Sequence, residues 1–168
     1  PAHMSLKNYH TVLRHASFGA SGMAWSDLTE LTRFKPVQLV AVAEVDLSRT
    51  GELKKAFPHT RIYQDWRELL DKEGKQLDSV NVSTPDHMHA PIAMSALQLG
   101  KNVYCQKPLT HDLYEARKLT EFARSKGVVT QMGIQIHSSS FYRLAVLLIQ
   151  AGTIGRIKEV HSYVGAIW

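Results

Sequence analysis

Residues with chemically useful side chains follow two short apolar runs in this sequence. Gln106 and Lys107 come directly after Asn102–Cys105, and the segment Ser83–His87 comes directly after Asp78–Val82. A lysine ammonium can stabilise a developing alkoxide or give a proton to an oxygen, and hydroxyl and imidazole groups can bind a polar ligand. The carboxyl ends of parallel strands form the ligand crevice of an open α/β sheet, so both clusters are predicted to face one ligand. Taken alone, a lysine before a proline is also typical of a solvated turn.

A glycine-rich turn, Ser17-Phe18-Gly19-Ala20-Ser21-Gly22, lies between a strand candidate and a helical pattern. It matches the dinucleotide-binding pattern, with Ser17 in place of the first glycine. Gly19 would let the backbone approach a pyrophosphate, Gly22 would allow close packing of helix on strand, and the helix N-terminus would attract the anion. Glu44 closes the next apolar run, where an acid is expected to hold the ribose hydroxyls. The turn predicts a dinucleotide site; its alternative is a purely structural turn.

Glu44 also bears on which dinucleotide is bound. Its carboxylate can accept hydrogen bonds from two ribose hydroxyls, whereas it would repel the 2′-phosphate of NADP. Arg49, five residues further on, could reach that phosphate and is the counter-argument. The predicted cofactor is NAD, with NADP as the alternative, and no metal site is predicted.

The elements that must position these residues alternate between apolar runs and helical patterns. The strand candidates are Tyr9–Ala16, Val37–Ala43, Asp78–Val82, Asn102–Cys105, Val128–Met132 and Ile157–Val164. The helix candidates are Ser21–Thr32, Ser48–Phe57, Asp65–Asp71, Pro91–Leu99, Leu113–Lys126 and Ser139–Ala151. Gly100, Gly127 and Gly152 follow three of these helices as C-terminal stops. The alternation predicts one α/β domain with a doubly wound, mostly parallel, Rossmann-like sheet. His15 interrupts the first apolar run and is expected to be a hydrogen-bonded core histidine, the alternative being that it lines the site.

Composition excludes several classes of protein. The chain has 168 residues, of which 44% are hydrophobic and 21% charged, as in an ordinary globular domain. Its one cysteine excludes a disulfide framework, and no apolar run approaches the ~20 residues of a membrane span. The formal charge of +5 raises the question of nucleic acid, but the basic residues are scattered among acids, so no nucleic-acid partner is expected. A cytoplasmic location is expected, with the periplasm as the alternative if a signal peptide was removed. Pro1–Met4 reads as a cloning remnant, which leaves residues 5–168 for the domain.

Two longer motifs carry a family resemblance. They are the segment from Ser83 to His87 and the segment Gly100-Lys101-Asn102-Val103-Tyr104-Cys105-Gln106-Lys107-Pro108-Leu109. Together with Gly133–Ser138 and Ile149–Gly155, they resemble the glucose–fructose oxidoreductase / inositol dehydrogenase / MocA family. The resemblance implies an N-terminal Rossmann domain that binds NAD or NADP. It also implies hydride transfer between the nicotinamide and a hydroxyl-bearing carbon of a sugar, sugar acid or cyclitol.

Carried over by position, the resemblance assigns a role to each candidate residue. The pyrophosphate is assigned to Ser17, Phe18, Gly19, Ala20, Ser21 and Gly22, and the adenosine ribose to Glu44. The nicotinamide half is assigned to Ser83, Thr84, Pro85 and His87, and its ribose to Gln135. Gln106 and Lys107 are also assigned to the cofactor. Lys107 is the implied catalytic residue, which hydrogen-bonds or donates to the substrate oxygen. His137 is assigned to the substrate side, the alternative being a structural histidine.

The chain departs from the family in sequence and in length. Gln106 stands where members usually have glutamate, and Ile134 and Ile136 stand where relatives often carry asparagine and glycine. Members add a second domain that supplies an aspartate–histidine partner for the lysine, so the resemblance implies that this domain is absent here, removed by design or by proteolysis. Apolar residues near the end of the chain, Val160, Val164, Ile167 and Trp168, would then be bared, and a homo-oligomer is allowed. The alternative function is a non-catalytic NAD(H)-binding sensor or scaffold, against which Lys107 favours an enzyme.

Overall fold

A computed structural model describes residues 12–34, 36–163 and 165. The chain divides after Gly133 into two compact units, which are described one at a time. The predicted cloning remnant Pro1–Met4 and the first three residues of the strand candidate Tyr9–Ala16 lie outside the described residues, as do Val164, Ile167 and Trp168. Val160 is exposed.

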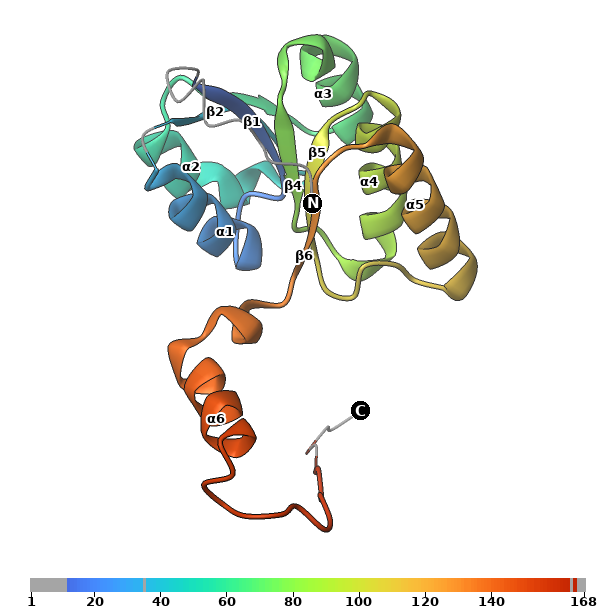
Figure 1. The fold of residues 1–168 in the computed structure, drawn as a ribbon. Coiled ribbons are helices and arrows are strands. Elements are labelled where there is room, and N and C mark those ends of the chain that lie inside the picture. The colour runs from blue at the N-terminus through green and yellow to red at the C-terminus, as the bar shows by residue number, and fades with distance from the viewer. Residues whose placement is uncertain (1–11, 35, 164, 166–168) are drawn as a thin grey trace. The chain divides into compact units, whose positions relative to one another are not determined.

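The first unit is built on one six-stranded sheet in the order β3-β2-β1-β4-β5-β6 (Figure 1). The strands are β1 (Leu13–Phe18), β2 (Val37–Ala43), β3 (Arg61–Tyr63), β4 (Ser79–Val82), β5 (Asn102–Gln106) and β6 (Thr130–Gly133). Every pair of neighbours is parallel. The chain order reverses between β1 and β4, which makes this the topological switch point where open α/β sheets bind ligands. The predicted doubly wound, parallel α/β fold is confirmed.

Helices cover the sheet on both faces because each strand buries side chains in two directions. The helices of the first unit are α1 (Met23–Thr32), α2 (Gly51–Ala56), α3 (Trp66–Glu73), α4 (His89–Gln98) and α5 (Leu113–Lys126), with short 3-10 turns at Leu47–Thr50, Gly74–Gln76 and Asp86–Met88. Leu28 of α1 and Leu53 of α2 pack with Leu39 and Val42 of β2 in one apolar cluster. The larger cluster on the other face joins α3, α4 and α5 to the remaining strand residues.

Two strand predictions differ from the structure. No strand forms at residues 157–163, so the predicted strand Ile157–Val164 is wrong in its described part. A strand needs a neighbour to pair with, and in the described part of the second unit nothing pairs with this segment. The sequence pattern does not predict the strand β3, because Arg61–Tyr63 is only three residues long and lacks an apolar run.

The second unit is small. It contains a 3-10 turn, Gln135–Ser138, and the helix α6 (Ser140–Gln150), in which no residue is buried. Gly152 follows α6 with a φ of +77°, and Gly100 and Gly127 follow α4 and α5 with φ of +70° and +64°. The three predicted glycine stops therefore all adopt the backbone conformation that glycine makes cheap.

Candidate cofactor-binding site

The glycine-rich turn leaves β1 and enters α1 through a backbone path that excludes a side chain. Gly19 has a φ of +106°, and a Cβ there would lie 2.7 Å from the carbonyl oxygen of Ser83 and 2.8 Å from the Cβ of Ala24. Ser17, in the place of the first glycine, is buried and its hydroxyl donates to the carbonyl of Gly19 at 2.8 Å. The side chain of Phe18 lies in the core, fully buried, so only its backbone can take part in the turn.

No side chain caps the N-terminus of α1. Its N-cap residue is Gly22, with φ of +58° and ψ of −122° and no side-chain hydrogen bond to the first turn. A helix start of this kind presents backbone donors and a partial positive charge to an anion. The turn therefore fits a pyrophosphate.

Glu44 lies beside the turn, at the carboxyl end of β2. One of its carboxylate oxygens accepts a hydrogen bond from the backbone N–H of Ala20 at 3.0 Å, and the other accepts from the N–H of Asp46 at 3.1 Å. An adjacent hollow of about 440 Å³ is lined by Ala20, Ser21, Gly22, Trp25, Ser48, Arg49, Gly51 and Glu52. This hollow joins the glycine-rich turn to the residues after β2, as the adenosine half of a dinucleotide requires. Arg49 lines it and pairs with Asp46 at 3.4 Å.

The segment after β4 turns away from the sheet at its carboxyl end. The backbone N–H of Ser83 donates to the carbonyl of Phe18 at 2.9 Å, which ties this segment to the end of β1. Ser83 and Thr84 are half-buried, and Pro85 and His87 are exposed. Within the described residues the buried hydroxyl of Thr84 has no hydrogen-bond partner. A buried hydroxyl of this kind is satisfied when a ligand or a water bonds to it, which suits the predicted role of this segment.

Gln106 and Lys107 stand at the carboxyl end of β5, next to that segment in the sheet. The Gln106 side chain is buried, whereas Lys107 is exposed and starts a cis peptide bond to Pro108. The pairing of Val82 with Cys105 brings the ends of β4 and β5 side by side. The two predicted clusters therefore lie together at the carboxyl ends of the strands, where Gly19 and Glu44 also lie.

Asp27 is a site residue that the sequence interpretation missed. It lies on the sheet side of α1, where it is 8% exposed, and both of its carboxylate oxygens accept from the amide of Gln106, at 3.0 and 2.8 Å. The hydroxyl of Ser83 donates to the same carboxylate at 2.6 Å. This contact explains Gln106, because a glutamate there would face Asp27 with a like charge. The signal in the sequence was an acidic residue on the apolar face of a helix, between Ala24 and Leu28.

His89 is a second missed residue. It is the first residue of α4 and is 1% exposed. One ring nitrogen lies 2.5 Å from the carbonyl oxygen of Pro108, and the other lies 2.8 Å from the carbonyl oxygen of Thr84. His89 thus connects the segments that follow β4 and β5 and fixes their separation.

His15 lies deeper in the sheet and is 3% exposed. Its ring nitrogens lie 2.8 Å from the hydroxyl of Ser79 and 3.0 Å from the amide oxygen of Asn81. Burial lowers the pKa of His15, and the hydrogen bond with Asn81, which raises the pKa, offsets only part of this lowering. Because the amide of Asn81 in turn donates to Ser83 at 2.9 Å, His15 supports the site from below, as a hydrogen-bonded core histidine.

Gln135 and His137 belong to the second unit, in its 3-10 turn. The His137 ring stacks on Tyr142, with centroids 5.4 Å apart and planes 17° from parallel. Their predicted places near the nicotinamide and the substrate remain predictions.

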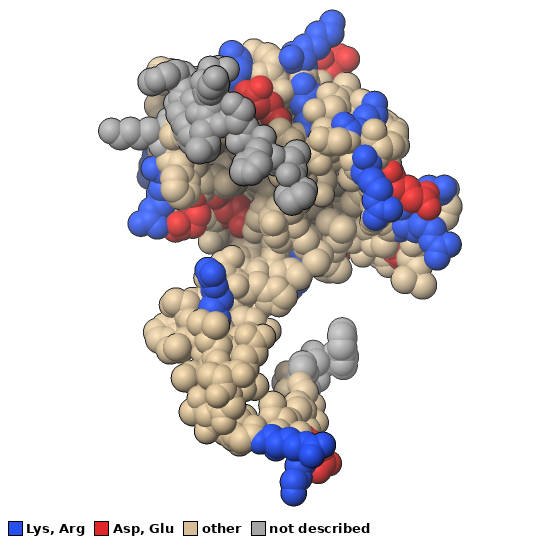
Figure 2. Space-filling view, viewed as in Figure 1, with Lys and Arg blue, Asp and Glu red and all other residues tan. Residues whose placement is uncertain are grey.

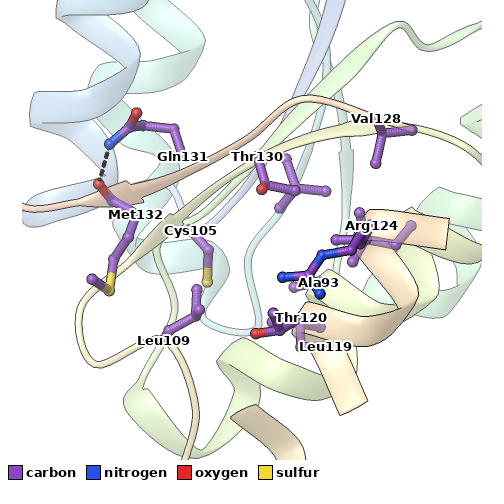
Figure 3. Close-up of a pocket in the computed structure, with 13 residues that line it drawn as sticks. Ala93, Cys105, Leu109, Leu119, Thr120, Arg124, Val128, Thr130, Gln131 and Met132 are labelled. Atoms are coloured by element: carbon purple, nitrogen blue, oxygen red, sulfur yellow. Dashed lines mark hydrogen bonds between the residues drawn. The ribbon is translucent and has the colours of Figure 1, made fainter. Parts of the chain in front are cut away.

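A separate hollow of about 370 Å³ lies away from the glycine-rich turn, between α5 and the strands β5 and β6 (Figure 3). Its lining is mostly apolar, from residues such as Leu109, Leu119 and Met132. Burial raises the pKa of the Cys105 thiol in this lining to about 12, so the thiol is protonated and unreactive at neutral pH. None of the predicted site residues lines this hollow.

Three further features of the described residues bear on the function: the surface charge, any membrane-spanning helix and any metal site. On the face shown in Figure 2, Lys and Arg side chains are scattered among Asp and Glu and form no single patch. Among residues 12–163, no helix is long and apolar enough to cross a membrane. In that same part of the chain, no three His, Cys, Asp or Glu side chains are grouped as metal ligands.

Known proteins share this sequence pattern and this fold. Levoglucosan dehydrogenase of Pseudarthrobacter phenanthrenivorans is 30% identical over 122 residues, which cover 73% of this chain and 30% of that protein. Trans-1,2-dihydrobenzene-1,2-diol dehydrogenase of Bos taurus is 28% identical over 149 residues, or 87% of this chain and 44% of that protein. The crystal structure of myo-inositol 2-dehydrogenase from Lactobacillus plantarum superposes with a TM-score of 0.78 at 26% identity, over 86% of this chain and 43% of that one.

The chain thus spans less than half the length of these relatives. Its match to their family is nevertheless extensive. The sequence model of the Gfo/Idh/MocA oxidoreductase family, described as an NAD-binding Rossmann fold, matches residues 13–134. This range contains the whole parallel sheet, the glycine-rich turn and the strand ends with Ser83 and Lys107. The chain therefore belongs to the Gfo/Idh/MocA oxidoreductase family and holds its NAD-binding Rossmann fold.

Proposed function

We propose that this chain is the nucleotide-binding part of an oxidoreductase that acts on a hydroxyl-bearing carbon of a sugar, sugar acid or cyclitol. The observation that carries the proposal is the meeting of Gly19, Glu44, Ser83 and Lys107 at one edge of the sheet, within the stretch that matches the family. The relatives support the substrate class, since they include dehydrogenases named for levoglucosan, a cyclic diol and an inositol.

Different residues of the chain would bind different parts of the dinucleotide. The turn at Gly19 and the start of α1 would hold the pyrophosphate through backbone N–H groups. Glu44 would exchange its bonds to the backbone of Ala20 and Asp46 for bonds to ribose hydroxyls. The unpaired hydroxyl of Thr84 would bond to the nicotinamide half.

Lys107 would be the catalytic residue. When bound, the nicotinamide supplies hydride transfer to or from the substrate carbon. In the direction of reduction, the Lys107 ammonium gives a proton to the carbonyl oxygen as that carbon becomes an alcohol. In the direction of oxidation, the amine takes the hydroxyl proton as the carbon becomes a carbonyl. An exposed ammonium at the end of β5 can reach a substrate that approaches from solvent.

We infer that NAD is preferred to NADP. Glu44 supports this preference, because its carboxylate would repel a 2′-phosphate. Arg49 lines the same hollow and could bind that phosphate, but its guanidinium already pairs with Asp46. Solved structures with this fold include a biliverdin reductase from Synechocystis in complex with NADP⁺, 27% identical to this chain, so NADP also occurs on this fold.

Calorimetric titration of the 168-residue chain with NAD⁺, NADH and NADP⁺ tests the proposal. Saturable binding of NAD⁺ and NADH is expected, with weaker binding of NADP⁺. Glu44→Gln should narrow the difference between NAD⁺ and NADP⁺, whereas Glu52→Gln, in the same hollow but on α2, should leave it nearly unchanged. Absence of binding by every nucleotide would contradict the proposal, and tighter binding of NADP⁺ would reverse the cofactor preference.

A further inference from the structure

The buried carboxylate of Asp27 has no place in the phosphate, ribose or proton-transfer roles given above. It is 8% exposed, and in the described part of the chain it forms no ion pair. Three hydrogen bonds from neutral donors hold it: two from the Gln106 amide, at 3.0 and 2.8 Å, and one from the Ser83 hydroxyl, at 2.6 Å. Both carboxylate oxygens of Asp27 act as hydrogen-bond acceptors. The protein therefore keeps an acidic group beneath the site without a neutralising cation.

The position of this carboxylate relative to the site follows from its partners. Gln106 is the residue before Lys107, and Ser83 is the first residue beyond β4. Asp27 is bonded to both, so it lies one side chain away from the two strand ends that are assigned to the nicotinamide half of the cofactor. Its surroundings are buried, so solvent screens its field less than it screens the field of a surface carboxylate.

A fixed negative charge acts differently on the two forms of the cofactor. The nicotinamide ring of NAD⁺ carries a positive charge, which the ring of NADH lacks, while the pyrophosphate and adenosine halves are the same in both. A carboxylate near the ring therefore stabilises bound NAD⁺ relative to bound NADH. A group that only held the fold together would change the affinities for both forms alike.

We propose that Asp27 is a specificity-determining residue that biases the site toward the oxidised form of the cofactor. The proposal rests on the proposed function, since it needs the nicotinamide to lie at the ends of β4 and β5. Gln106 has a defined part in it. The Gln106 amide donates to Asp27 and leaves the negative charge on α1. A glutamate at position 106 would instead repel the Asp27 carboxylate.

The test is the ratio of two dissociation constants, Kd of NADH over Kd of NAD⁺, measured by titration of the 168-residue chain. Asp27→Asn removes the charge and keeps a side chain of the same shape, which can still accept from Ser83. The ratio should fall about three- to tenfold, the range expected for one partly screened charge. Glu30→Gln is the matched control, since it removes one exposed carboxylate from the same helix, and it should leave the ratio unchanged.

A double variant guards against a loss of folding. Asp27→Asn combined with Gln106→Glu moves the carboxylate across the same hydrogen bond, so it should restore the wild-type ratio or exceed it. The proposal is overturned if Asp27→Asn weakens both forms equally, or if the double variant binds both forms with the ratio of the single variant. If the wild-type chain binds neither form, the proposed function itself has failed, and this outcome is distinct from the other two.

Discussion

At the scale of single residues, backbone geometry and buried polar side chains shape the candidate site together. Gly19 gives the chain a path that no other residue could follow without a clash. Below it, a row of hydrogen bonds runs from His15 through Asn81 and Ser83 to Asp27. Buried polar groups are costly unless they are paired, so each member of this row holds the next in one orientation.

Replacement of Gly19 by valine tests the backbone part of the site. The new Cβ would meet the Ser83 carbonyl at 2.7 Å, and the φ of +106° would be strained for any residue with a side chain. We expect nucleotide binding to be lost and the free energy of unfolding to fall by about 1–3 kcal/mol, the cost of backbone strain at one position. Calorimetry and chemical denaturation measure the two effects. Gly100→Ala, which also has a positive φ but open space around it, should lose some stability and keep its binding.

His15 should make the stability of the protein depend on pH. Burial lowers its pKa in the folded chain below the ordinary value of 6.5, so in acid the unfolded chain binds this proton more readily. The free energy of unfolding should therefore fall as the pH drops from about 6.5 toward the lowered pKa, with a slope of up to about 1.4 kcal/mol per pH unit. His15→Gln should remove this part of the slope. Denaturation at pH 7.5 and 5.5 measures it, and an exposed-site variant, His87→Gln, should keep the wild-type slope.

At the scale of elements, β3 shows how side chains can place a strand that has little apolar surface. Arg61 and Tyr63 from this strand both donate to the carboxylate of Glu73 at the end of α3, Tyr63 at 2.6 Å. The Glu73 side chain is 4% exposed, and the hydrogen bonds from Arg61, foremost, and from Tyr63 lower its pKa. The edge of the sheet beside β2 is thus anchored to a helix by charge and hydrogen bonds.

Glu73→Gln should loosen this edge. The variant keeps the shape of the side chain but loses the charged acceptor, so the free energy of unfolding at pH 7 should fall by about 1–3 kcal/mol. Because the pKa of Glu73 is lowered in the folded state, its contribution is present above the ordinary value of 4.5 and is lost as the pH falls through the lowered value. The gap between wild type and variant should therefore close in acid. Glu68→Gln on the same helix, whose carboxylate pairs with Lys72 on the surface, should cost less than about 1 kcal/mol at any pH.

At the scale of the whole molecule, the sequence predicts the sheet better than it predicts the site. Apolar runs such as Val37–Ala43 mark buried strands, and the glycine stops mark helix ends, because both follow from local chemistry. The pairing of Asp27 with Gln106 joins residues 79 positions apart, and no local pattern announces it. Gln135 and His137 are assigned to the site by the family resemblance alone, since no local pattern around them predicts a contact with a cofactor.

The last prediction concerns what the 168-residue chain can do by itself. The sheet unit has its own core and the whole glycine-rich turn, so we expect nucleotide binding. Hydride transfer also needs the substrate carbon held against the nicotinamide, and orientation of this kind can account for about 7–11 kcal/mol of a barrier. An acid–base partner typically raises the rate by a further ~10²–10⁴-fold.

The chain spans less than half the length of its relatives, and at the described strand ends Lys107 is the one group proposed for proton transfer. We therefore expect binding without turnover when NAD⁺ is mixed with a panel of sugars, polyols and inositols and NADH absorbance is followed. Rapid NADH formation by the wild-type chain that a Lys107→Met variant abolishes would contradict this expectation and show that the sheet unit suffices for catalysis.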